Sequence, residues 1–194
     1  MKYASLVPLC GLFIATSAHG ASILADSVSI TRTSQISNPG FHITEVQVFE
    51  QGTAVNVAAA SVGATATASS TGWGTSPAWA IDGNTDGAFG ANSTWHDLDG
   101  QAGDDPNQAD VLTVSFGSAK TVDSFDVWGR SDCCADRDDG INVDFFLGGN
   151  LVVNQPSGIT TGFNTGMTTI IPEPAVSALV AGAALIGFRR RRRA

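Results

Sequence analysis

The sequence has few of the features on which several common protein classes depend. It contains three cysteines, Cys10, Cys133 and Cys134, and no apolar run as long as the roughly 20 residues that a membrane-spanning helix needs. It also lacks the Gly-x-Ser-x-Gly motif of serine hydrolases and the His-Glu-x-x-His motif of zinc proteases. Because the chain carries no catalytic motif of these kinds, we do not expect an enzyme.

Basic residues are scarce once the two ends of the chain are set aside. Of the ten lysines and arginines, Lys2 and the arginines at positions 189–193 lie at the ends, whereas all but one of the eighteen acidic residues lie between them. The four basic residues that remain are Arg32, Lys120, Arg130 and Arg137. So acidic a domain would be repelled by phosphate backbones, and we do not expect nucleic acid as a partner.

The N-terminus has the layout of a secretion signal. Lys2 precedes an apolar run from about Ala4 to Ala15, and small residues follow at positions 16–21. This order of positive charge, short apolar stretch and small residues is typical of a cleaved signal peptide. We therefore expect residues 1–21 to be removed on export and only Cys133 and Cys134 to remain.

The C-terminus combines Pro172-Glu173-Pro174, an apolar segment at positions 175–188 and the arginine cluster. This arrangement resembles the PEP-CTERM sorting signal of Gram-negative bacteria, which implies a single hydrophobic helix over 171–194. The resemblance implies transient retention in the inner membrane, cleavage by an exosortase-type transpeptidase, and display at the cell surface or in exopolysaccharide. The alternative is an ordinary tail anchor, whose arginines would stay on the cytoplasmic side.

Between these ends, short stretches with alternating apolar and polar residues predict an all-β domain over residues 22–156. Every second residue of segment 141–147 is apolar, and similar patterns occur at 27–33, 41–49, 111–116 and 122–128. Gly148-Gly149-Asn150 predicts a turn into a further strand. We expect a sandwich or jelly roll of about eight antiparallel strands. The small residues at 58–70 fit an edge strand or a surface segment, and 157–170 reads as a linker to the tail.

The string Arg130-Ser131-Asp132-Cys133-Cys134-Ala135-Asp136-Arg137 is the most specific in the domain. Neighbouring Cα atoms lie about 3.8 Å apart, whereas an ordinary disulfide spans about 4.4–6.8 Å, so a bond between the two cysteines would close a strained ring. The alternatives are two separate thiols or an intermolecular bridge. Two guanidinium groups beside a small apolar ring suit a sugar, whose hydroxyls and apolar face they would bind. The alternative for the arginines is ion pairing with Asp132, Asp136, Asp138 and Asp139.

This string resembles the signature of the F-type lectins (fucolectins), a branch of the discoidin-like jelly rolls. The matching positions are Arg130, Asp132, Cys133, Cys134 and Arg137, and Ser93-Thr94-Trp95-His96 resembles the Ser-x-x-His that precedes the signature in that family. The resemblance implies that His96 and the two arginines bind a sugar, typically L-fucose, while the cysteine ring packs against it. The 33 residues between His96 and Arg130 exceed the family spacing, and we place the excess in the loop 97–110.

The same resemblance implies a structural calcium ion. Trp79-Ala80-Ile81-Asp82-Gly83-Asn84 resembles the calcium loop of the family, which uses oxygen ligands that suit Ca²⁺. The ligands implied here are Trp79 through its backbone, Asp82, Asn84 and Ser93. Segments 27–33 and 42–49 resemble the last two strands of the family, which indicates a circular permutation; Thr44 and Glu45 would then complete the site. Without the resemblance, Asp-Gly-Asn is a turn and Glu45 an exposed strand residue.

The expected function is therefore that of an exported, lectin-like, carbohydrate-binding protein whose partner is a glycan or exopolysaccharide. The alternative is a non-catalytic structural protein of the matrix that has the same fold and no sugar pocket. The arrangement of His96, Arg130 and Arg137 discriminates between them, because a sugar site requires these side chains to converge.

Overall fold

The computed structural model describes residues 22–32, 40–90, 92–98, 110–134, 140–157 and 168–170. Within these ranges the chain forms nine β-strands and two short 3₁₀ turns. The strands are β1 (Ile23–Arg32), β2 (His42–Ile43), β3 (Glu45–Glu50), β4 (Thr65–Ala68), β5 (Trp95–His96), β6 (Val111–Trp128), β7 (Ile141–Leu147), β8 (Asn150–Ser157) and β9 (Thr168–Thr169); the turns are η1 (Ala60–Val62) and η2 (Pro77–Ile81). The predicted all-β class is confirmed.

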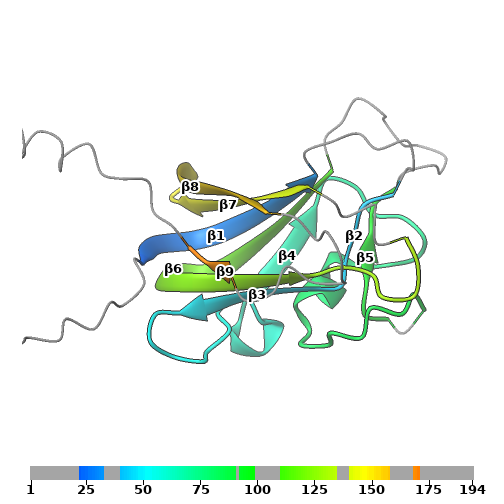
Figure 1. Ribbon diagram of the computed structural model, residues 1–194, viewed down its shortest axis with the longest axis horizontal. Helices are drawn as coiled ribbons and strands as arrows, with labels where there is room; N and C mark the ends of the chain where they lie inside the picture. Colours follow the sequence, from blue (N-terminus) through cyan, green and yellow to red (C-terminus); the bar gives the residue numbers. More distant parts are fainter. Residues whose placement is uncertain are drawn as a thin grey trace, which may run out of the picture.

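Seven strands form one antiparallel sheet, and two form a small second sheet. The main path is β3-β6-β1-β7-β8, with β4 and β9 also paired to β6, while β2 pairs with β5. Strand β6 links the two halves of the large sheet, because its first part pairs with β1 and β4 and its last part with β3 and β9. Figure 1 shows β8, β7, β1, β6 and β3 one after another, with the β2–β5 pair at the far end of these strands.

The alternating pattern puts apolar side chains into one core. In β7, Ile141, Val143 and Phe145 are fully buried while the residues between them are partly exposed. The Phe145 ring packs against Phe125 of β6 with centroids 5.9 Å apart. The predicted turn is also present: Gly148 and Gly149 both have positive φ, as a tight turn between two antiparallel strands requires.

Three segments differ from the sequence-based expectation. Segment 41–49 forms two strands rather than one, because the chain leaves the first pairing at Thr44, whose amide donates to the Trp128 carbonyl at 2.7 Å. The two strands expected at 111–116 and 122–128 are one continuous strand, since Lys120 and Val122 also pair with β1. The expected linker 157–170 ends inside the fold: β9 pairs with β6, and Ile170 is fully buried.

Segment 58–70 contributes both η1 and β4, and β4 pairs with β6 alone among the described strands, as an edge strand does. No helix in the described ranges is long and apolar enough to cross a membrane. The predicted signal peptide at 1–21 and the sorting tail with Pro172, Glu173 and Pro174 lie outside the described residues, and so does the predicted tail helix.

Candidate functional site

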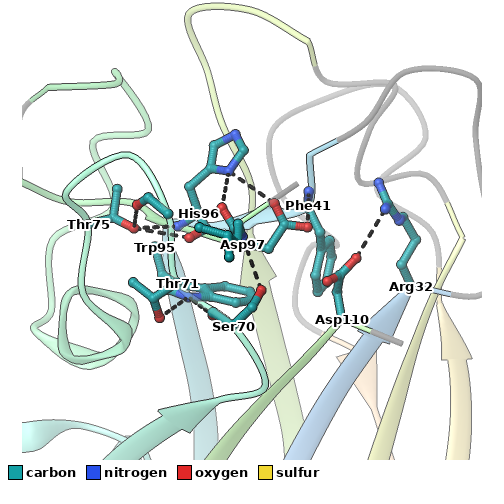
Figure 2. A network of polar contacts seen from close by, with 11 residues as sticks. Arg32, Phe41, Ser70, Thr71, Thr75, Trp95, His96, Asp97 and Asp110 are labelled. Carbon is teal, nitrogen blue, oxygen red and sulfur yellow. Dashed lines mark hydrogen bonds and ion pairs between the residues drawn. The ribbon is translucent and has the colours of Figure 1, made fainter. Parts of the chain in front are cut away.

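His96 lies in β5, where it pairs directly with His42 of β2. A neighbouring loop holds its backbone on the other side. The His96 amide donates to Thr75 Oγ1 at 3.0 Å, and the His96 carbonyl accepts from the Gly72 amide at 2.9 Å. Trp95, the preceding residue, is buried and donates its indole N–H to the Ser70 carbonyl (Figure 2). The backbone of His96 is therefore fixed from two sides.

The His96 ring is held by Asp97. Its Nδ1 lies 3.1 Å from Asp97 Oδ1 and 3.0 Å from the Asp97 carbonyl oxygen. The other carboxylate oxygen, Oδ2, accepts from the Phe41 amide at 2.9 Å. Burial raises the pKa of Asp97, but the hydrogen bonds from His96 and Phe41 outweigh this effect and hold the pKa below its ordinary value. Asp97 is therefore held as an ionised carboxylate, although its side chain is fully shielded from solvent.

Two exposed aromatic residues surround the imidazole. The ring centroid of Trp73 lies 5.7 Å from that of His96, and the centroid of Phe89 lies 6.2 Å from it. Trp73 is 53% exposed and Phe89 is 37% exposed, which is unusual for side chains of this size. Trp73 also has φ of 57°, a strained conformation for a bulky residue and one that is typical of functional loops.

Arg130 lies against the same phenyl ring as His96. The guanidinium carbon of Arg130 is 4.4 Å from the centroid of Phe89, within the range of a cation–π contact. Phe89 therefore brings His96 and Arg130 together, although 33 residues separate them in the sequence. Arg137, the second predicted arginine, lies outside the described residues.

Arg130 is also ion-paired with Asp132. Its Nε donates to Asp132 Oδ1 at 2.6 Å and its Nη2 to Oδ2 at 3.2 Å. The Arg130 side chain lowers the pKa of Asp132, first through this hydrogen bond and then through its charge. Ion pairing, the alternative weighed for Arg130, is thus observed with Asp132. The pairing also fixes the guanidinium plane and leaves Nη1 without a hydrogen bond to any described residue.

Gly87 makes the contact between Phe89 and Arg130 possible. A Cβ atom at this position would lie 2.6 Å from the Ser131 nitrogen and 2.7 Å from the Gly129 carbonyl oxygen, which is closer than packing allows. The Ser131 amide instead donates to the Gly87 carbonyl at 3.0 Å. The two loops therefore touch through their backbones.

Cys133 and Cys134 are bonded to each other in the structure, as one of the sequence interpretations expects. Their Cα atoms are 3.8 Å apart, and Cys134 has φ of 61°. Cys133 is exposed and follows directly on the Arg130–Asp132 pair. The bonded pair therefore presents an apolar surface close in sequence to Arg130.

A pocket of about 110 Å³ opens beside the aromatic residues. Its walls include Trp73, Trp79 and Phe89, and its polar lining comes from Thr75, Asn92, Ser93 and Thr94. Two of the residues predicted to hold calcium, Trp79 and Ser93, therefore also line the pocket. The aromatic cluster and the predicted calcium loop are thus neighbours.

Glu45 lies at the start of β3 and is fully buried, so it is not an exposed strand residue. Its Oε2 accepts from the Gly83 amide at 3.2 Å, while its Oε1 is buried without a hydrogen-bond partner among the described residues. Burial raises the pKa of Glu45 to about 8, and the nearby charge of Asp82 adds to the increase. An oxygen in this position is suited to a bound cation.

The other predicted ligands lie close to Glu45 along three segments. Asp82 directly follows η2 and accepts from the Asn84 amide at 2.8 Å, and Asn84 in turn accepts from the Asp86 amide at 3.0 Å. Ser93 donates to the Asp86 carbonyl. Thr44 Oγ1 lies 3.1 Å from Thr94 Oγ1. Residues 44–45, 82–84 and 93–94 are thus neighbours.

Within the described ranges, no three His, Cys, Asp or Glu side chains gather in a metal-binding group. A cation here would therefore depend on hydroxyl and carbonyl oxygens beside the two carboxylates of Glu45 and Asp82. Such mixed oxygen sets suit Ca²⁺, and the unpartnered Oε1 of Glu45 fits that role.

Sequence reasoning missed Trp73 and Phe89. Both lie in loops, where periodicity carries no signal, but both stand beside glycine in the strings Gly72-Trp73-Gly74 and Phe89-Gly90. A large aromatic residue in a glycine-rich loop is a usable signal of an exposed ring.

Comparisons with models of known protein families, with curated proteins and with solved structures found no match to this chain.

Proposed function

We propose that this protein is an exported, lectin-like protein that binds a carbohydrate through Trp73, Phe89, His96 and Arg130. The observation that carries the proposal is the Phe89 ring, whose centroid lies 6.2 Å from that of the His96 ring and 4.4 Å from the guanidinium carbon of Arg130. An exposed aromatic ring packs against the C–H face of a sugar, while an imidazole and a guanidinium hydrogen-bond to its hydroxyls. The bonded cysteines extend the apolar surface.

The resemblance to F-type lectins supports the same interpretation and adds Asp132, Cys133, Cys134 and Arg137 to the proposed site. It also supports a discoidin-like jelly roll as the finer description of the fold. A single monosaccharide site binds weakly, with dissociation constants of about 1 μM to 1 mM, so display of many copies would raise the effective affinity.

The proposed place of action is outside the inner membrane of a Gram-negative bacterium, at the cell surface or in its exopolysaccharide matrix. The two ends of the sequence support this proposal: the signal-like residues 1–21, and the tail with Pro172, Glu173 and Pro174. Processing of that tail would require an exosortase-type transpeptidase and transient contact with the membrane.

We also propose a structural Ca²⁺ ion held by Thr44, Glu45, Trp79, Asp82, Asn84 and Ser93. The buried Oε1 of Glu45 supports the proposal, because a carboxylate that lacks a partner is costly unless a cation or a proton neutralises it. The ion would supply positive charge between segments that the pocket also uses. In this proposal the sugar is bound by protein side chains, and the ion does not contact it.

A glycan array tests the proposed function. The oxidised wild-type protein is expected to bind a defined set of glycans, and Arg130→Ala and Trp73→Ala are expected to lose at least tenfold in affinity, since each removes a direct contact. Lys120→Ala is the matched control for Arg130, because it removes one positive charge from strand β6 and leaves the loop of Arg130 unchanged. Leu151→Ala is the control for Trp73, because it removes an exposed apolar side chain from β8. Full binding by both site variants would refute the proposed site.

The second candidate function, a structural matrix protein without a sugar pocket, is favoured by one observation. Asp132 already occupies two nitrogens of Arg130, so these donors are satisfied without a ligand. A free monosaccharide distinguishes the two functions: it should compete with glycan binding if a pocket exists, and it should have no effect if the protein adheres to polymers through an extended surface.

A further inference from the structure

The hydrogen-bond partners of His96 determine where the proton of its neutral ring resides. Nδ1 faces two oxygens, Asp97 Oδ1 at 3.1 Å and the Asp97 carbonyl at 3.0 Å. A carbonyl oxygen and an ionised carboxylate oxygen only accept hydrogen bonds, so Nδ1 has to carry the hydrogen. Figure 2 shows both contacts on one ring nitrogen while the other nitrogen points away from Asp97.

The carboxylate of Asp97 cannot easily move away from the ring. The carboxylate is fully buried, and two hydrogen bonds join Asp97 to Phe41. The Asp97 amide donates to the Phe41 carbonyl at 3.0 Å, and the Phe41 amide donates to Asp97 Oδ2 at 2.9 Å. The amide of the next residue, Leu98, donates to Ser70 Oγ at 3.0 Å. The reciprocal pair of hydrogen bonds with Phe41 holds Asp97 Oδ1 toward the imidazole, as a carboxylate orients a histidine in other protein sites.

Nε2 is consequently the ring nitrogen that remains for a ligand, and no described residue hydrogen-bonds to it. In the neutral ring it carries a lone pair and accepts a hydrogen bond. Arg130, which contacts the same Phe89 ring, can only donate. The two side chains that contact Phe89 therefore offer one acceptor and one set of donors.

We propose that Asp97 is a positioning residue that fixes His96 as the Nδ1–H tautomer and thereby makes the site select neutral, hydroxyl-bearing sugars over acidic ones. A hydroxyl group can donate to Nε2 and another can accept from Arg130. A carboxylate, sulfate or phosphate has no hydrogen to donate. Its negative charge would therefore face the lone pair of Nε2 and be repelled by it. The part of this proposal that concerns selectivity rests on the proposed function, whereas the tautomer is a property of the protein alone.

The tautomer can be measured without any ligand. The full oxidised protein is labelled with ¹⁵N at histidine, and long-range ¹H–¹⁵N spectra at pH 8 distinguish a nitrogen that carries hydrogen from one that does not. We expect His96 to be neutral, with hydrogen on Nδ1 and none on Nε2. Hydrogen on Nε2 alone, or a doubly protonated ring, would overturn the proposal.

Asp97→Asn provides the matching perturbation. An asparagine that keeps its Oδ1 toward the Phe41 amide presents an NH₂ group to Nδ1, which competes with the unchanged main-chain carbonyl of residue 97, so the share of the tautomer with hydrogen on Nε2 is expected to rise. Ser70→Ala is the control, because it removes the partner of the Leu98 amide without touching the ring, and its tautomer should stay as in the wild type. An unchanged tautomer in Asp97→Asn would contradict the positioning role. If that variant does not fold, the wild-type spectrum still decides the tautomer.

Selectivity is measured on an array that holds neutral glycans and glycans ending in uronic or sialic acids. We expect the wild type to favour the neutral glycans, and Asp97→Asn to lose about tenfold of that preference, because an Nε2–H donor accommodates an acidic group. A wild-type preference for acidic glycans would overturn the selectivity. Binding to none of the glycans would instead refute the proposed function and leave the tautomer result standing.

Discussion

The buried carboxyl group of Glu45 makes the stability of the domain depend on pH. Burial raises its pKa to about 8 in the folded protein, whereas the ordinary value is 4.5. Between these two pH values the folded protein keeps a proton that the unfolded chain has released. The free energy of unfolding therefore falls as pH rises through this window and levels off above it.

The magnitude follows from the size of the shift. Each unit of difference in pKa corresponds to about 1.4 kcal/mol, so the free energy of unfolding should fall by roughly 3 kcal/mol between pH 4.5 and pH 7. That is a large part of the total stability of a typical domain. A cation bound to Oε1 would favour the ionised form, so calcium should remove this loss and stabilise the protein most at pH 8.

Urea unfolding curves measure the effect. They are recorded at pH 5, 7 and 8, once in excess chelator and once in millimolar CaCl₂, for the wild type and for Glu45→Gln. The glutamine cannot ionise, so the variant should lose both the decline in chelator and the stabilisation by calcium. The difference between the two proteins also removes the contributions that all other groups make equally to both.

Glu50→Gln is the matched control, because Glu50 lies on the same strand but is only partly buried. It should behave like the wild type. The reasoning about Glu45 is refuted if the wild type in chelator keeps a constant free energy of unfolding from pH 5 to pH 8. A calcium effect that persists unchanged in Glu45→Gln would refute its role as a ligand.

Three further predictions concern the loops that form the candidate site. Phe89→Ala should lower glycan affinity at least tenfold in isothermal titration calorimetry, since it removes the ring that both His96 and Arg130 contact. Unchanged affinity would contradict the bridging role of Phe89. Gly87→Ala should destabilise the domain by about 1–3 kcal/mol in urea unfolding, because its Cβ would overlap the backbone of the Arg130 loop; a change below about 0.5 kcal/mol would count against that contact. Reduction of Cys133 and Cys134 should abolish glycan binding while the far-UV circular dichroism of the sheet is retained, and full binding by the reduced protein would remove the ring from the site.

Much of the fold could be predicted because half-buried strands leave a periodic signal. Ile141, Val143 and Phe145 alternate with polar residues, and all three are buried in β7. The division of segment 41–49 also left a signal, since the apolar phase changes between Ile43 and Val46, on either side of the break at Thr44. The continuity of β6 left none, because it depends on pairing with β1, a segment distant in sequence.

The candidate site was predictable only in part. The string around Cys133 identified Arg130, and the resemblance to F-type lectins identified His96, but neither identified Phe89, which brings the two together. That contact depends on the close approach of Gly87 to Ser131, a tertiary feature that no local pattern encodes. The sequence assigned Asp97 only to the loop 97–110. Its role depends on burial beside Phe41, which no local pattern indicates.

The most direct test of the proposed sugar site is a crystal structure of the oxidised protein with the glycan that binds most tightly on the array. We expect the sugar ring to lie against Phe89 and Trp73, with hydroxyl groups within hydrogen-bond distance of Arg130 and of His96 Nε2. A glycan bound at another surface, with these four side chains left in water, would contradict the proposed site.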